Sequence, residues 1–389
     1  MYVGFMHNFR KPPKLVEVLA MACKHYNIDI VYMRPADVDI ERNVIRGKVL
    51  VDNKWKIKEV EIPPFIDISP YCFKQKNRTI TNYLKERTFL SDNRENVLTK
   101  ERLQDKLKED PKFSHLVIPT EVIKNLNDIK NYLEQYPKII LKPLRGIKGK
   151  GVYMLSKEED HYKISYNKDE WTLDDDGLQN FYRETIALRK YIMQKSINSR
   201  SLQGDPFDCR LHVQKDGEGK WVSASNYIRV GIGQKVVSNI SQGGGIAEPK
   251  EFLKANYGDL GVKLNKQLNE VAKTLPYKIE ELRGTHIMSL GIDIGIDSDG
   301  KLYLFEVNDG PGTSRIIGEV AILRSGYYKY VLEEIISEPK LATSQNIFNP
   351  SKELSLYQKE VELYKKEIDL LKKEIELLKK EKTITERVY

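Results

Sequence analysis

Two apolar, strand-like stretches joined by the turn sequence DSDGK impose the strongest constraint on how this chain folds. In the segment GIDIGIDSDGKLYLFEVND, Asp293 lies on the first stretch, and Glu306 and Asn308 lie on the second. Residues two apart on a strand point to the same face, and pairing of the stretches as a hairpin can bring Asp293 beside the other two. Two carboxylates and an amide oxygen are typical ligands of Mg²⁺. The alternative is three polar positions on a solvent-facing strand, and the spacing alone fits both interpretations.

A second constellation is Lys142 followed by a loop rich in glycine and lysine, in the segment KIILKPLRGIKGKGVYML. An ammonium group that ends an apolar run is unfavourable to bury without an anionic partner. Gly149 and Gly151 would let backbone N–H groups approach an anion closely, and Lys148 would add positive charge. The spacing is neither a Walker A loop nor a GxGxxG turn before a helix. The alternative interpretation is an exposed hairpin turn.

A third group of polar residues consists of Arg210 in DCRLHV, Arg229 in YIRVG and Asn239 in SNISQGGG. The two arginines lie on adjacent expected strands of the hairpin DCRLHVQKDGEGKWVSASNYIRV, next to a glycine-rich loop that could cover a ligand. Guanidinium groups bind phosphate or carboxylate bidentately and stabilise charge during phosphoryl transfer. Arg315, in NDGPGTSR, is a fourth candidate.

Composition indicates an ordinary globular protein with anionic partners. The chain has 64 basic and 56 acidic residues, giving a net charge of +8, which favours phosphates, carboxylates and anionic polymers. No nucleic-acid-binding motif is visible, so we expect no nucleic-acid partner. No apolar run approaches the roughly 20 residues that span a bilayer. The three cysteines and six histidines fit no metal-binding or nucleophilic pattern, and the cysteine usage is typical of a reducing cytosol.

The order of expected elements predicts a small α/β unit over residues 1–90. A buried strand at Tyr2–Met6 precedes a helix that opens with two prolines, and the strand IDIVYM follows, which is the pattern of a βαβ unit with a parallel sheet. Asn77–Leu107 is charged and helical in character, and HLVIPTEVI is expected to be a strand. The region 91–336 is richer in strands, with a helix expected from about Asn265 to Leu275.

A heptad pattern occupies residues 352–382, beyond an expected linker at 337–351. It has β-branched or apolar residues at a and d, glutamates at g and lysines at e, which favours a parallel two-stranded coiled coil. The alternative is one long helix packed on its own globular domain. Leucines at every c position, outside a dimer seam, suggest docking onto another surface or a higher oligomer. The a and d positions are Leu354, Val361, Ile368, Ile375, Tyr357, Tyr364, Leu371 and Leu378.

The order of the three constellations resembles the ATP-grasp superfamily, and more closely its YheC/YheD-like, endospore coat-associated group, over roughly residues 1–335. The resemblance implies an α/β (α+β) ATP-grasp fold, with two subdomains in 91–336, a hinge near 194–198 and the α/β domain at 1–90. It implies ATP and Mg²⁺ as cofactors. Lys100 and Lys142 match the family's phosphate-binding lysines, and the loop after Lys142 matches its flap. The remaining matches are Gln194, Lys195 and Ile197 for adenine, Arg210, Arg229 and Asn239 for catalysis, and Asp293, Glu306 and Asn308 for magnesium.

This resemblance implies an ATP-dependent carboxylate–amine ligase that forms an amide through an acylphosphate, on an acidic substrate of the peptide or polysaccharide type. Two alternatives stay open: a kinase-like enzyme that stops at phosphorylation, and a nucleotide-binding assembly protein built around the coiled coil. We expect a cytoplasmic location, with an association with a spore coat or an envelope-building assembly as an extension of it. No acidic residue for the ribose is evident after the hinge, where Asn198 stands.

The heptad pattern yields a direct test of oligomerisation. Deleting residues from 351 onward should give a smaller oligomer while leaving nucleotide binding intact, because the pattern lies beyond every constellation described above. Light scattering measures the mass, and an unchanged mass would refute the role of this segment in oligomerisation.

Overall fold

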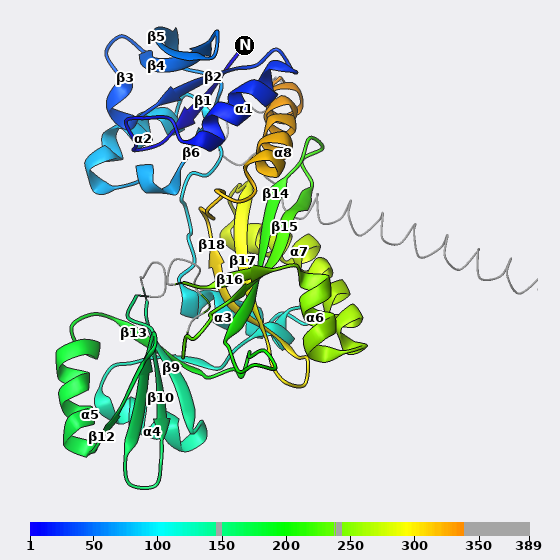
Figure 1. The fold of residues 1–389 in the computed structure, drawn as a ribbon. Coiled ribbons are helices and arrows are strands. Elements are labelled where there is room, and N and C mark those ends of the chain that lie inside the picture. Colours follow the sequence, from blue (N-terminus) through cyan, green and yellow to red (C-terminus); the bar gives the residue numbers. More distant parts are fainter. Residues whose placement is uncertain (145–149, 237, 239–242, 338–389) are drawn as a thin grey trace, which may run out of the picture.

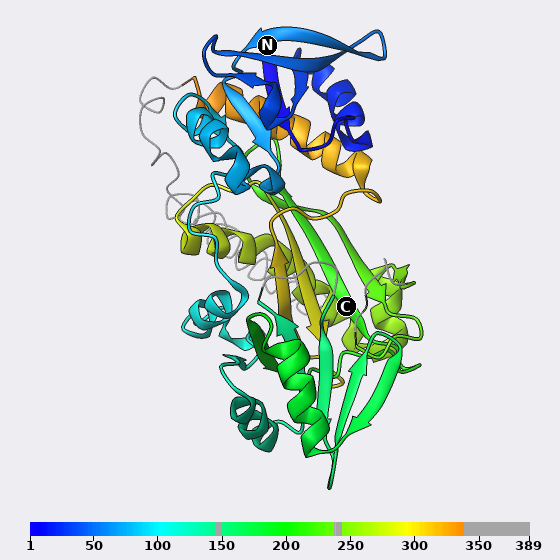
Figure 2. The same cartoon turned by 90° about the vertical axis from the view of Figure 1, so that its left-hand side faces the viewer.

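The computed structural model describes residues 1–144, 150–236, 238 and 243–337. Three sheets follow one another along the long axis of the molecule, and helices pack against each of them (Figures 1 and 2), so the expected mixed α/β class is confirmed. Within the described part of the chain, no helix is both long and apolar enough to cross a bilayer. The expected coiled coil at 352–382 lies outside the described residues.

The N-terminal sheet has seven strands in the order β3-β4-β2-β1-β6-β7, with β5 paired to β4. Strand β1 pairs in parallel with both β2 and β6, which confirms the expected βαβ unit. Helix α1 begins directly after Pro13, where a missing N–H is least harmful. The elements are β1 (Tyr2–Met6), α1 (Lys14–Lys24), β2 (Asp29–Met33), β3 (Val38–Asp39), β4 (Val44–Val51), β5 (Lys54–Glu61), β6 (Phe65–Ile68), α2 (Arg78–Lys85) and β7 (Phe89–Leu90).

The last described α-helix, α8 (Ile317–Tyr330), packs mainly against α1 and also contacts β14 and β15 of the middle sheet (Figure 1). Its buried residues share one apolar cluster with those of α1 and β1. A buried ion pair adds to this contact, since Arg324 Nη1 lies 3.0 Å from Asp67 Oδ2 on β6. The chain therefore returns to its N-terminal sheet after completing the middle one.

The middle sheet has five strands in the order β16-β15-β14-β17-β18, all antiparallel. Both hairpins expected from the turns DGEGK and DSDGK are present. Helix α7 is longer than the expected Asn265–Leu275 and contains a buried proline, Pro276. The elements are α3 (Lys100–Lys108), β14 (Phe207–Lys215), β15 (Trp221–Val230), β16 (Gly245–Ala247), α6 (Pro249–Tyr257), α7 (Leu260–Arg283), β17 (Ser289–Ile296) and β18 (Leu302–Asn308).

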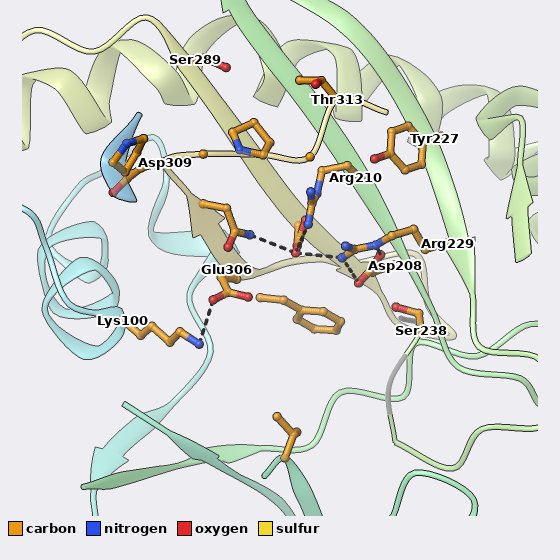
Figure 3. Close-up of a pocket in the computed structure, with 18 of the residues that line it drawn as sticks. Lys100, Asp208, Arg210, Tyr227, Arg229, Ser238, Ser289, Glu306, Asp309 and Thr313 are labelled. Carbon is orange, nitrogen blue, oxygen red and sulfur yellow. Dashed lines mark hydrogen bonds and ion pairs between the residues drawn. The ribbon is translucent and has the colours of Figure 1, made fainter. Parts of the chain in front are cut away.

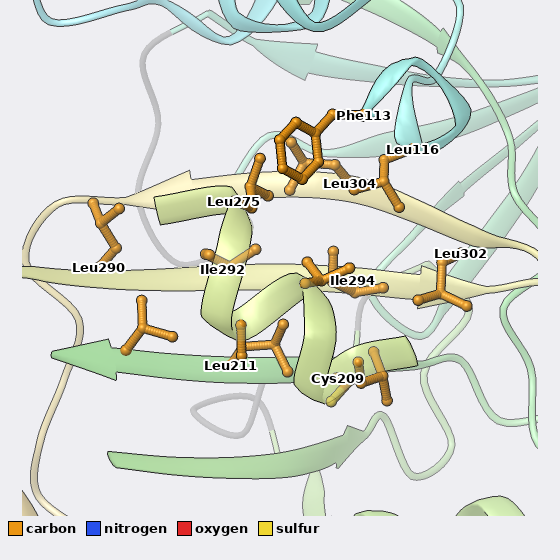
Figure 4. Close-up of a cluster of buried hydrophobic side chains, with 14 of the residues drawn as sticks. Phe113, Leu116, Cys209, Leu211, Leu275, Leu290, Ile292, Ile294, Leu302 and Leu304 are labelled. Carbon is orange, nitrogen blue, oxygen red and sulfur yellow. The ribbon is translucent and has the colours of Figure 1, made fainter. Parts of the chain in front are cut away.

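One face of this sheet forms the largest apolar core of the described chain, and α7 covers it (Figure 4). Alternation along the strands selects this face: Leu211 on β14 and Ile292 on β17 are fully buried in the core. Their sequence neighbours Arg210 and Asp293 point to the opposite face. The same alternation that builds the core therefore delivers polar residues to the other side of the sheet.

The third sheet has six antiparallel strands in the order β12-β11-β10-β9-β13-β8. Lys142 is on its strand β9, and the expected hinge near 194–198 begins in the last two residues of strand β13. The elements are β8 (Thr120–Val122), α4 (Leu126–Gln135), β9 (Lys138–Pro143), β10 (Tyr153–Lys157), β11 (Tyr162–Tyr166), β12 (Asp169–Leu173), α5 (Asp175–Phe181), a π-helical turn (Tyr182–Ile186) and β13 (Tyr191–Lys195).

Two expectations from the sequence were wrong in detail. The segment Asn77–Leu107 is not one helical region, because β7 and an irregular stretch separate α2 from α3. The stretch HLVIPTEVI forms a short 3₁₀ turn at Ser114–Leu116 before strand β8 begins at Thr120. Both differences come from tertiary contacts: β7 pairs with β6, and Leu116 packs into the core over the middle sheet.

The strand register can be tested through stability. Ile292→Ala should lower the free energy of unfolding by about 3 kcal/mol, because it leaves a cavity in a fully buried core. Val262→Ala on the surface of α7, where the side chain is 67% exposed, should change it by less than about 0.5 kcal/mol. Urea denaturation of both variants measures the difference; equal effects would contradict the register.

Candidate active site

One large cavity, of about 1240 Å³, lies where the three sheets meet. Its lining includes Phe5 from the first sheet, Lys142 from the third, and Arg210 and Glu306 from the middle one. The residues with predicted roles in chemistry therefore converge from separate parts of the sequence (Figure 3).

Four charged side chains gather on the polar face of the middle sheet. Arg210 lies directly opposite Asp293 on β17, and Arg229 on β15 lies opposite Asp208. Arg210 donates to Asp293 through Nε and through Nη2, the latter at 2.9 Å. Arg229 donates to both oxygens of Asp208 at 2.6 Å, and its Nη2 lies 2.8 Å from Asp293 Oδ2. Two carboxylates and two guanidinium groups thus neutralise one another.

The burial of these charges sets their ionisation. Burial alone would raise the pKa of Asp293, but Arg229 and Arg210 hold that pKa below its ordinary value. The pKa of Asp208 is raised, because burial there outweighs the attraction of Arg229. Asp293 therefore stays a carboxylate at neutral pH and keeps both arginines in place.

The other two predicted magnesium ligands lie beside Asp293. Glu306 is its direct cross-strand partner, and Asn308 Nδ2 lies 3.4 Å from Asp293 Oδ2. Glu306 Oε1 also forms an ion pair of 2.8 Å with Lys100 Nζ, at the beginning of α3. The hairpin thus brings the three side chains together, and each of the two carboxylates is paired with a cationic side chain (Figure 3).

Lys142 is a buried cation at the edge of this cluster. Its Nζ donates to the carbonyl oxygen of Phe305 at 3.2 Å, and it forms no ion pair with any carboxylate of the described residues. Burial and the neighbouring Lys100 lower the pKa of Lys142 to about 7, against the opposing effect of Glu306 and Asp293. An ammonium group in this position would be stabilised by an anion bound in the cavity.

Residues of the expected hinge line the same cavity on the side of the third sheet. Gln194 is buried and donates to Thr120 Oγ1 at 2.6 Å, while Lys195 and Ile197 continue the lining. Gly151 does not line the cavity; its φ of +74° and the Arg189 side chain, which occupies the space that a Cβ would need, explain the glycine structurally. The predicted residues Lys148, Gly149 and Asn239 lie outside the described residues.

Sequence reasoning missed several residues that hold the site. Asp208 stands two positions before Arg210, so strand periodicity could have found it. Asp309 follows Asn308 and is paired with both Arg94 and Arg283, which ties the segment before α3 to the end of β18. These partners are distant in sequence, and no local pattern pointed to them.

The architecture is that of an ATP-grasp protein. It matches the crystal structure of N5-carboxyaminoimidazole synthetase from Staphylococcus aureus complexed with ADP at a TM-score of 0.50, with 14% identity, over 84% of this chain and 77% of that one. More narrowly, the chain belongs to the YheC/D like ATP-grasp family, whose sequence model matches residues 91–329. The expectation drawn from the sequence is confirmed at both levels.

Two curated relatives extend the similarity beyond that region. The endospore coat-associated protein YheD of Bacillus subtilis (strain 168) is 23% identical over 325 residues, covering 78% of this chain and 70% of YheD. The endospore coat-associated protein YheC of the same organism is 22% identical over 311 residues, covering 77% of this chain and 85% of YheC.

The depressed pKa of Lys142 predicts a pH-dependent stability difference. Above pH 7 the folded protein binds fewer protons at Lys142 than the unfolded chain does, so the contribution of this residue to the free energy of unfolding rises with pH. The stability of Lys142→Met relative to wild type should therefore be highest at pH 7 within the range from pH 7 to 9.5, and it should fall by about 3 kcal/mol by pH 9.5.

Urea denaturation at the two pH values measures this change. Lys14→Met, at a lysine that is 66% exposed, is the matched control and should show no comparable pH dependence. If the free energies of unfolding of Lys142→Met and wild type differ by the same amount at both pH values, the lowered pKa of Lys142 is contradicted.

Proposed function

We propose that the protein is an ATP-dependent carboxylate–amine ligase that forms an amide bond through an acylphosphate. The observation that carries this proposal is the gathering of four cationic side chains around Asp293 and Glu306 in one cavity of an ATP-grasp protein. The four cations are Lys100, Lys142, Arg210 and Arg229. Such a set suits a reaction whose main requirement is to hold and neutralise phosphate charge.

Lys142 and Lys100 are the residues that would hold the phosphates of ATP. Lys142 is buried without a carboxylate partner, and phosphate oxygens would supply the negative charge that it lacks. Lys100 is bound to Glu306 and is 24% exposed, so it can exchange this partner for a phosphate. Gln194, Lys195 and Ile197 line the same cavity on β13, which pairs with the strand of Lys142, and directly after it; the adenine would bind there.

Asp293, Glu306 and Asn308 fit magnesium as a donor set, since they offer only oxygen ligands from adjacent positions of one hairpin. Magnesium bound there would neutralise charge on the phosphates. Their carboxylates are paired with Arg210, Arg229 and Lys100. These cations would turn to the phosphates as the nucleotide binds, which predicts that magnesium binds together with ATP and only weakly by itself.

In the proposed reaction, an oxygen of the substrate carboxylate attacks the γ-phosphorus and the bond to the β-γ bridging oxygen breaks, giving ADP and an acylphosphate. The amine nitrogen then attacks the acyl carbon, loses a proton, and releases inorganic phosphate as the amide forms. Arg210 and Arg229 would stabilise the transferring phosphoryl group and the acylphosphate. The protein contributes position and charge, and no nucleophile of its own is needed.

The positive net charge makes an acidic substrate of the peptide or polysaccharide type the proposed acid. A cytoplasmic enzyme that assembles through the segment 352–382 and works beside a spore coat or envelope structure would agree with the names of the Bacillus subtilis relatives.

The assignment of Glu306 can be tested by Glu306→Gln. Loss of its charge should lower the rate of ADP release by roughly 100-fold, because the amide would be a weaker ligand of magnesium and would no longer form an ion pair with Lys100. Glu170→Gln is the matched control, since Glu170 forms an ion pair of the same 2.8 Å length with Lys163 at the outer edge of the third sheet. Equal rates in the two variants would contradict the proposed role.

The assay screens carboxylic acids paired with amino acids for ADP release, with mass spectrometry of the product. A requirement for the amine supports the ligase, while turnover of the acid without any amine would favour the kinase-like alternative. ATP binding without turnover of any pair would favour the assembly protein.

A further inference from the structure

A track of polar side chains runs along the middle sheet, away from the candidate phosphate site and toward the N-terminal sheet. Beyond Arg210, the same face of β14 carries His212 and Gln214. Their partners on β17 are Gly291 and Ser289, and Gln214 also accepts a hydrogen bond from Arg324 of α8 at 3.2 Å. Figure 3 shows Ser289 on the far side of Arg210 from Lys100.

Unpaired hydrogen-bonding atoms are concentrated along this track. Both ring nitrogens of His212, Gln214 Nε2, Ser289 Oγ and Arg324 Nε are buried without a partner in the described chain. Such atoms are rare in folded proteins, and each one destabilises the fold unless water or a ligand binds it. Four neighbouring residues share this deficiency, and two of them, Ser289 and Arg324, line the cavity, which points to a group bound beside these two.

Hydrogen-bond donors dominate this set, which identifies the chemistry of the missing group. Arg324 uses Nη1 on Asp67 and Nη2 on Gln214, so its Nε–H remains. Gln214 accepts from Arg324 with Oε1, which leaves its NH₂ as a donor. Asp67 is already bound by Ser91 and Tyr328. An oxygen-rich acceptor such as a carboxylate would satisfy several of these donors at once.

The cavity offers both access and room for such a group. Ser289 and Arg324 line the same cavity as Lys142 and Arg210. Its volume of about 1240 Å³ exceeds the roughly 300–1,000 Å³ of a site for one drug-sized ligand, which leaves space beyond a nucleotide. Gln214 is four residues from Arg210, so the two ends of the track lie roughly 13 Å apart along the strand.

We propose that Ser289 and Arg324 bind a second carboxylate of the acid substrate, roughly 13 Å along β14 from Arg210, so that the enzyme selects peptide-sized acids with a carboxylate at each end. This inference rests on the proposed function, which puts the reacting carboxylate near Arg210. The track would therefore select substrates by length, since single amino acids are too short to reach from Arg210 to Arg324.

Two series of synthetic peptides test this selection by length. Succinyl-glycine peptides with one to five glycines have a carboxylate at both ends, and the matched acetyl-glycine peptides have only the C-terminal one. With the full chain, MgATP and hydroxylamine to trap acylphosphate as hydroxamate, kcat/KM for the succinyl series should exceed that for the acetyl series. Since each glycine adds about 3.4 Å, the ratio should peak at about two or three glycines.

Variants locate the effect. Ser289→Ala and Arg324→Lys should each lower the succinyl preference by about tenfold, because each loses a hydrogen bond to a charged group. Ser223→Ala and Arg34→Lys are the matched controls and should keep the preference, since neither residue lines the cavity and Arg34 forms a similar pair with Asp37.

Failure of the inference and failure of the proposed function have different signatures. Equal hydroxamate formation from both series would contradict the second carboxylate site, and ordered water alone would then occupy the track. This result would still be consistent with the proposed ligase. If no hydroxamate forms from either series, calorimetry on the protein with MgADP measures the binding of the succinyl and acetyl peptides. Tighter binding of succinyl than acetyl peptides without hydroxamate would keep the site and reject the ligase; equal binding without hydroxamate would reject both.

Discussion

The buried cluster of Asp208, Arg229, Asp293 and Arg210 is the interaction on which the rest of the site depends. Four charges removed from water are tolerable only because each has an opposite partner at hydrogen-bonding distance. The cluster exists because β15, β14 and β17 pair in one register, with the core residues on the reverse face. A slip of β14 by one residue would turn Asp208 and Arg210 into the apolar core and separate them from Arg229 and Asp293.

The same cluster couples the proposed steps to one another. Asp293 is held by two arginines and Glu306 by Lys100, so under the proposed function the two carboxylates would become available to magnesium only when these cations gain phosphate oxygens in exchange. This exchange would make the site complete only with nucleotide bound. Because α8 returns to the N-terminal sheet, it adds Arg324 to the lining of the cavity, and the proposed acid site would lie on the same face of the middle sheet as the candidate phosphate site.

Much of this arrangement could be predicted from local sequence, because local rules govern it. The hairpin with Asp293, Glu306 and Asn308 follows from alternation and a turn sequence, and Lys142 is conspicuous at the end of an apolar strand. The pairing of Arg210 with Asp293 and the separation of α2 from α3 depend on contacts between distant segments. The track through Ser289 and Arg324 likewise needs three elements that only the folded chain brings together.

The measurement that tests the central claim most directly is the transfer of a carboxylate oxygen to phosphate. With an accepted acid carrying ¹⁸O at both oxygens of its reacting carboxylate, an acylphosphate pathway predicts one ¹⁸O atom in each inorganic phosphate released with the amide. Mass spectrometry of the phosphate reads this out. Unlabelled phosphate alongside labelled amide would contradict the account, because the carboxylate would then not have been the group that accepts the phosphoryl of ATP.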